Sequence, residues 1–144
     1  MMTINAEQVM RDLQIIVNRV ADMTPVLRTI GDHQREAVED RIMTGKRAPD
    51  GNPWAPWRPW RAAERAAKGN AAQGLLWDTG DLLHSLITDV EIDRVSIGTE
   101  VGYARELQFG RHDMEPRPFM GWGPSDVAEA DRLAMTYIMT GAVP

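Results

Sequence analysis

Hydrophobic residues recur at helical spacing through the first 45 positions and predict two consecutive helices. Asn5 is available as the N-cap of the first helix. The second follows Thr24-Pro25, which suits an N-cap and a proline in the first turn, and its apolar stripe runs to Gly45. The positions that set the spacing of the first helix are Val9, Leu13, Ile16, Val17 and Val20.

The middle of the chain breaks this pattern. Residues 46 to 60, "KRAPDGNPWAPWRPW", hold four prolines, an Asp-Gly turn and three tryptophans, so they predict a loop without regular structure. Residues 61 to 68 regain helical propensity and end at Gly69-Asn70, but they are alanine-rich with little to bury. We expect this alanine-rich stretch to be mobile or stabilised by a partner. Residues 45 to 74 as a whole should form an extended loop or insertion within a single domain of residues 1 to 144.

Short β-branched runs follow and predict a small sheet. "SLITDVEI" and "RVSIGTE" flank Asp93 and are typical of an antiparallel hairpin. "GYARELQFG" predicts a short helix, and "RPFMGW" one more strand. Pro124-Ser125-Asp126 cap a last helix. The order predicts an α+β domain: two N-terminal helices, a long Trp/Pro loop, a small antiparallel sheet with helices on one face, and a C-terminal helix.

Composition narrows the possible functions. The 144-residue chain has no cysteine, so disulfides and thiolate metal sites are excluded. Its net charge of −5 argues against a protein that wraps nucleic acid. Charged residues interrupt the N-terminal twenty positions, so we expect neither a signal peptide nor a membrane-spanning segment, and no membrane partner.

One tripeptide, Asp78-Thr79-Gly80, matches the catalytic loop of aspartic proteases. A homodimer would bring two such carboxylates together, as that chemistry requires. However, the leucines after Gly80 have helical spacing, and the Thr79 hydroxyl can cap that turn. We favour a helix start and keep a homodimeric protease using Asp78 as a remote alternative.

No other pattern indicates catalysis. His33, His84 and His112 are dispersed, and none pairs with another His or a carboxylate at the spacing of a metal site. No phosphate loop or nucleophile elbow stands out. We therefore expect no catalytic residue, no metal, no cofactor and no enzyme.

Trp54, Trp57 and Trp60 follow one another at intervals of three and could form a ridge in a polyproline-like loop. We expect them, with Arg58 and Arg61, to form a subunit or partner interface, where Trp and Arg are favoured. We expect at least one ring, that of Trp54, to cover the core instead. A stacking platform for nucleic acid, built from these rings with Arg58, Arg61 and Arg65, is an alternative.

Four stretches, "APDGNPWAPW", "LLWDTGDLLHSL", "VSIGTEVGYARELQFG" and "EPRPFMGW", occur in this order. Together they resemble the phage virion morphogenesis family, the Mu-type and P2-type tail completion proteins. The sequence departs from that pattern in its second and third tryptophans and in residues 61 to 73. The matching positions are Asp50, Gly51, Trp54, Leu75, Thr79, Gly80, Leu82, Ser85, Ile97, Gly98, Tyr103, Ala104, Phe109, Gly110, Arg117, Pro118 and Phe119.

The resemblance implies a structural protein of the virion of a tailed phage, assembled in the host cytoplasm. It implies a tail completion or tail terminator protein, a ring and by analogy a hexamer, at the head-proximal end of the tail, where it enables head-tail joining. Its partners would be further copies of itself, tail tube and sheath proteins, and neck or connector proteins, while DNA passes through the lumen without specific binding. A neck connector on the capsid side is the alternative.

Overall fold

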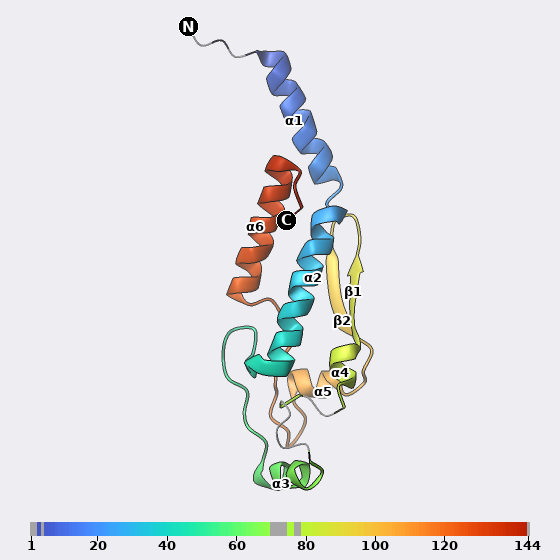
Figure 1. Ribbon diagram of the computed structural model, residues 1–144, viewed down its shortest axis with the longest axis vertical. Helices are drawn as coiled ribbons and strands as arrows, with labels where there is room; N and C mark the ends of the chain where they lie inside the picture. Colours follow the sequence, from blue (N-terminus) through green and yellow to red (C-terminus); the bar gives the residue numbers. More distant parts are fainter. Residues whose placement is uncertain (1–2, 4, 70–74, 77–78, 144) are drawn as a thin grey trace.

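The computed structural model of the chain describes residues 3, 5–69, 75–76 and 79–143. These residues form six α-helices, a π-helical turn and one antiparallel pair of strands, which confirms the predicted α+β class. The molecule is elongated, with helix α1 (Ala6–Ala21) at one end and helix α3 (Pro59–Ala67) at the other (Figure 1).

The two predicted N-terminal helices are present. In α1, the Asn5 Oδ1 atom accepts a hydrogen bond from the Glu7 N–H (3.0 Å), as the sequence predicts for its N-cap. Helix α2 spans Thr24–Asp40 and continues as a π-helical turn, η1 (Arg41–Gly45). The sequence predicted that the Thr24 side chain caps this helix. Instead, the Thr24 N–H donates a hydrogen bond to the Asp22 carboxylate (3.0 Å). The Thr24 hydroxyl and N–H lower the pKa of the Asp22 carboxyl.

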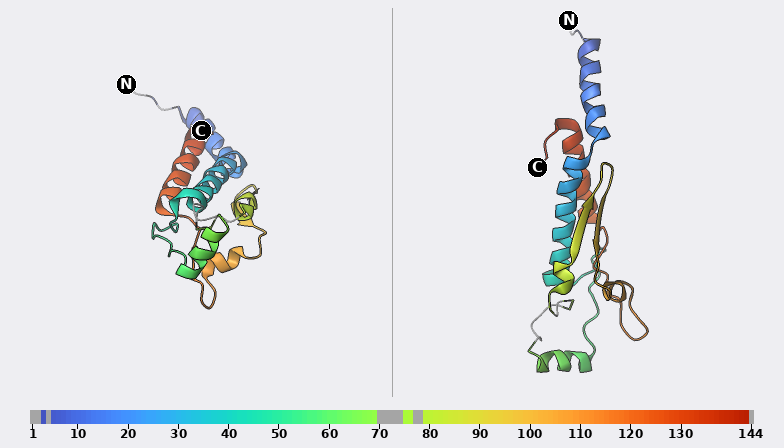
Figure 2. Two further views of the ribbon diagram at one scale, coloured as in Figure 1. Left: turned by 60° about the horizontal axis from the view of Figure 1, so that its bottom comes forward. Right: turned by 90° about the vertical axis from the view of Figure 1, so that its right-hand side faces the viewer.

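The predicted hairpin is also present. Strand β1 (Leu86–Val90) pairs with β2 (Val95–Thr99), with Leu86 opposite Thr99 and Val90 opposite Val95. Helix α2 lies along one face of this pair (Figure 2). Side chains alternate across the sheet, so Ile87 on the other face is exposed.

Four further helices complete the fold: α3, α4 (Asp81–His84), α5 (Ala104–Phe109) and α6 (Pro124–Thr140). The prediction that residues 46 to 60 lack regular structure is wrong at its end, because α3 begins at Pro59, where a proline suits the first turn. Of the expected loop, residues 70 to 74 lie outside the described residues.

The predicted caps of α4 and α6 need correction. Gly80, at a φ of 88° that favours glycine, is the N-cap of α4, and the Thr79 hydroxyl instead donates to the Asp81 carboxylate (2.6 Å). Helix α6 has Gly123 as its N-cap, and the Asp126 carboxylate in its first turn accepts the Gly123 N–H (2.7 Å).

The additional strand predicted at "RPFMGW" is wrong. These residues form an extended segment whose backbone pairs with a side chain instead of a strand. Gln108, on α5, accepts hydrogen bonds from the N–H groups of Phe119 (3.1 Å) and Met120 (3.0 Å) and donates to the Met120 carbonyl (3.0 Å). The Gln108 side-chain amide thus provides the hydrogen bonds that a neighbouring β-strand would otherwise make with this backbone.

Two clusters of buried side chains hold the elements together. The smaller lies between α2 and α6 and consists of Val26, Ile30 and Leu133. The larger joins the end of α2 to the Trp/Pro loop, α4, α5 and the extended segment. Its members are Val38, Ile42, Trp54, Leu76, Leu82, Leu86, Ala104 and Phe119.

Candidate assembly surfaces

The family-like positions fall mainly into the larger core and the turns around it. Trp54 is 6% exposed, and its indole N–H donates to the Pro118 carbonyl (2.8 Å), which joins the first and last of the resembling stretches. Leu82, Ala104 and Phe119 are buried in the same cluster, with Leu75 packed against it. The structure therefore brings together residues that the sequence separates by more than sixty positions.

Other family-like positions shape turns. The Asp50 carboxylate accepts the Asn52 N–H (3.0 Å), and Gly51 has a φ of 89°. At Gly110, with a φ of 76°, a Cβ atom would lie 2.8 Å from the Met114 carbonyl oxygen. Ser85 donates to the Leu82 carbonyl (2.8 Å), at the junction of α4 and β1.

The remaining family-like positions are less enclosed. Ile97 and Gly98 are half-buried on opposite faces of β2. Tyr103 and Phe109 bracket α5 as expected, but both side chains are exposed, Phe109 by 74%. Burial therefore gives no structural account of why an aromatic residue stands at position 109.

Arg117 fixes the Trp/Pro loop to the body. Its buried guanidinium donates to the carbonyls of Ala55 (2.9 Å) and Pro56 (3.0 Å), and burial lowers the pKa of this guanidinium. It also lies over the Trp57 ring, 4.5 Å from the ring centre. Charge-assisted hydrogen bonds and a cation–π contact thus add to the burial of Trp54 in holding the loop.

The three tryptophans do not form the single ridge considered from the sequence. Trp54 is buried in the core, which removes it from the expected interface. Trp57 is half-buried, with Arg61 and Arg65 also within 5.9 Å and 5.2 Å of its ring centre. Trp60, in the first turn of α3, is 63% exposed. Proline at positions 56 and 59 turns the chain between them, so equal spacing does not give a common direction.

Trp57 and Trp60 line a groove of about 310 Å³ at the α3 end of the molecule, which we call the α3 groove. Arg58 and Arg61 also line it, so four of the five predicted interface residues gather there. Leu107 and Met114 supply further apolar wall. Arg61 is paired with Glu64, whose pKa is lowered by hydrogen bonds from Lys68 and Arg61.

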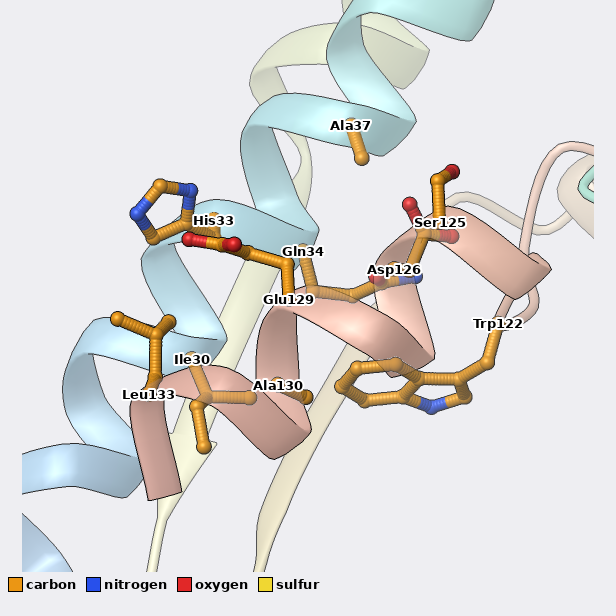
Figure 3. Close-up of a pocket in the computed structure, with 10 residues that line it drawn as sticks. All are labelled: Ile30, His33, Gln34, Ala37, Trp122, Ser125, Asp126, Glu129, Ala130 and Leu133. Carbon is orange, nitrogen blue, oxygen red and sulfur yellow. The ribbon is translucent and has the colours of Figure 1, made fainter. Parts of the chain in front are cut away.

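A second groove, of about 160 Å³, lies between α2 and α6 and was not predicted (Figure 3). Gln34 is buried in its wall; its amide N–H donates to the Gly121 carbonyl (2.8 Å), while its Oε1 atom has no partner among the described residues. The Glu129 carboxylate reaches from α6 toward His33 of α2, and Arg132 lowers the pKa of Glu129. Trp122 closes one side.

The candidate catalytic residue, Asp78, lies outside the described residues. Among the described residues, no three His, Cys, Asp or Glu side chains gather as a metal site. In the same part of the chain, no helix is long and apolar enough to cross a membrane.

These features define a small α+β protein in which most family-like positions maintain the fold and leave an aromatic groove at one end. The chain matches the phage virion morphogenesis family over residues 4–138 and belongs to that family, as its resemblance indicated. It is thus a bacteriophage protein, associated with the virion and with a structural or assembly role in it. No curated protein and no solved structure matches the chain.

Proposed function

We propose that this chain is the tail completion or tail terminator protein of its phage. In this role it forms a ring, by analogy a hexamer, at the head-proximal end of the tail and enables the head to join. The observation that carries the proposal is the α3 groove, where Trp60 is 63% exposed beside Trp57. Large aromatic side chains next to arginines are typical of the centres of protein interfaces.

The hairpin supports self-assembly through a second surface. Among the described residues, β1 and β2 pair with each other and with no third strand, so each has an outer edge with unpaired backbone groups. A ring needs two different faces on each subunit, and the outer edges of β1 and β2 can supply them while the α3 groove contacts the tail tube. Tail tube, sheath and neck proteins are the proposed partners at the two ends of the ring.

The negative net charge of the chain fits a ring whose central channel lets DNA pass without binding it specifically. Few cations are available to hold phosphates, since the chain has 16 Lys and Arg against 21 Asp and Glu. The alternative platform for nucleic acid gains no support, because Trp54 and Arg65 are buried and Arg61 is paired with Glu64.

We also propose that the protein is structural rather than catalytic. In the protease reading, the Asp-Thr-Gly loop would lie between strands, whereas here α4 begins directly after Gly80. A neck connector on the capsid side remains the second candidate, because the same exposed Trp60 surface would serve either junction.

Replacing Trp60 with alanine tests the proposal. An exposed side chain contributes little to folding, so the variant is expected to unfold at the same denaturant concentration as the native protein. Binding to purified tail tubes, measured by co-sedimentation, is expected to weaken about tenfold or more, since interface tryptophans carry much of the binding energy.

The matched control is Ile92→Ala. Ile92 is also an exposed apolar residue, at 58%, but it lies in the hairpin turn far from α3. It should bind tubes like the native protein. Equal binding by the native protein and the Trp60 variant would contradict a role for the α3 groove, and binding to capsids but not to tubes would favour the neck connector.

A further inference from the structure

Helix α1 exposes an apolar face that no other described part of the chain covers. None of its residues is buried, although its sequence is amphipathic. Five large side chains on one side of the helix are between 42% and 67% exposed: Val9, Met10, Leu13, Val17 and Val20. We call these five residues the α1 seam.

Polar contacts at its base, rather than the seam, hold α1 to the body. The Arg19 guanidinium donates to the carbonyls of Ile138 and Met139 (both 2.9 Å) at the end of α6. The Tyr137 hydroxyl donates to the Asp22 carbonyl (3.0 Å). These bonds direct the helix away from the molecule, so that its N-terminal half projects beyond α6 (Figures 1 and 2).

A helix in this position lacks the usual source of stability. An isolated helix of 16 residues is marginal in water, and most helices in proteins depend on burying an apolar face. The chain exposes 9528 Å², whereas a compact protein of 16.1 kDa exposes about 7,400 Å². This excess of about 2,000 Å² belongs to the whole elongated chain, and the projecting α1 contributes to it (Figure 1).

We propose that α1 pairs antiparallel with α1 of a second copy of this chain. Val9, Leu13, Ile16 and Val20 are separated by four, three and four residues, the spacing of the a and d positions of a coiled coil. Met10 and Val17 widen the apolar face on one side. The pairing therefore buries the seam of both copies.

The pattern also fits its own reverse, so a second copy of this chain can serve as the partner. When two α1 helices run antiparallel about a point between Gln14 and Ile15, Val9 of one copy faces Val20 of the other and Leu13 faces Ile16. Asp12 of one copy then lies on the same flank as Arg19 of the other. A two-fold contact requires such a patch, in which each residue meets its counterpart in the reversed order.

The charges of α1 argue against a membrane as the partner. Its polar side carries Glu7 and Asp12 against Arg11 and Arg19, whereas helices that lie on membranes usually have a basic polar face. The pairing also goes beyond the proposed tail role, because α1 and the α3 groove lie at opposite ends of the molecule.

Leu13→Glu tests the pairing, with Gln14→Glu as its control. Each variant adds one negative charge to α1, at adjacent positions, and leucine, glutamine and glutamate have similar helix propensities. Only residue 13 belongs to the seam. By light scattering over a range of concentrations, the native protein and the control should associate with the same dissociation constant. In Leu13→Glu this constant should rise at least about tenfold, because the charge would be buried.

Cysteine cross-linking tests the direction of the pair, since the native chain has no cysteine. A mixture of Val9→Cys and Val20→Cys proteins should form a disulfide-linked heterodimer on mild oxidation. Val9→Cys alone should not, because in the antiparallel pair the two copies of residue 9 lie about 16 Å apart along the axis.

Several outcomes would overturn the inference: a native protein that is monomeric at every concentration, equal association of Leu13→Glu and the native chain, or efficient cross-linking of Val9→Cys to itself. Binding of the monomer to vesicles of anionic phospholipid through the seam would also overturn it. Loss of tube binding in Trp60→Ala concerns the proposed function alone. Pairing through α1 can therefore succeed or fail independently of the tail role.

Discussion

Gly31 lies where α2 comes closest to the sheet. A Cβ atom at this position would stand 2.8 Å from methyl carbons of both Thr88 and Val95, and β-branched side chains have little freedom to move away. The glycine is therefore explained by the contact between helix and sheet rather than by backbone conformation.

Gly31→Ala is expected to destabilise the protein by about 1–3 kcal/mol, the usual cost of an overpacked core, although alanine favours the helix itself. Urea denaturation at a fixed protein concentration measures this change. Gly102→Ala is the control, since no atom lies within 4 Å of its added methyl group. Equal stability of the two variants would show that α2 does not approach the sheet this closely.

At the scale of single residues, the sequence predicted some roles and missed others. It predicted the burial of Trp54, because one aromatic ring of a loop commonly covers the core. It did not predict that Arg117 would stack on Trp57, since a charged residue in a Pro-rich segment usually indicates surface. The three equally spaced tryptophans were misleading because side-chain direction depends on backbone angles that spacing alone does not fix.

An ion pair with little exposure joins the start of α6 to the end of α2. The guanidinium of Arg41, in the π-helical turn, pairs with the Asp126 carboxylate in the first turn of α6, and both side chains are 11% exposed. Arg41 also donates to the Gly121 carbonyl (2.9 Å). This ion pair therefore adds to the apolar contacts of Val26, Ile30 and Leu133 further along the two helices.

Arg41→Met should cost about 3 kcal/mol of unfolding free energy, because it leaves the Asp126 carboxylate buried without its counter-ion. The control is Arg35→Met, which removes an exposed pair with Glu39 and should cost less than about 1 kcal/mol. Thermal or urea denaturation compares the two. Similar losses in both variants would contradict the special role of the Arg41 pair.

At the scale of elements, hydrophobic periodicity was sufficient for α1, α2, α6 and the hairpin. It failed at "RPFMGW", because the amide of Gln108 binds that backbone and a local pattern carries no information about such a distant side chain. The groove between α2 and α6 could not be predicted for the same reason. Gln34 and Trp122 come together there only after the chain has folded.

The whole molecule presents different chemistry at its two ends. The α1 end offers an apolar helix that fits a second copy, and the α3 end offers an aromatic groove. An elongated subunit of this kind can contact its own copies and another virion component at the same time. Membership in the phage virion morphogenesis family gives these surfaces a common context, the assembly of a virus particle.

The central claim, that the chain completes the tail, is tested most directly by complementation in vitro. A lysate of the phage with this gene disrupted should contain filled heads and separate tails, as electron microscopy would show. Addition of the purified protein should join them and restore infectious particles, whereas Trp60→Ala protein should restore fewer. Normal tailed particles in the defective lysate, or no rescue by the native protein, would contradict the account.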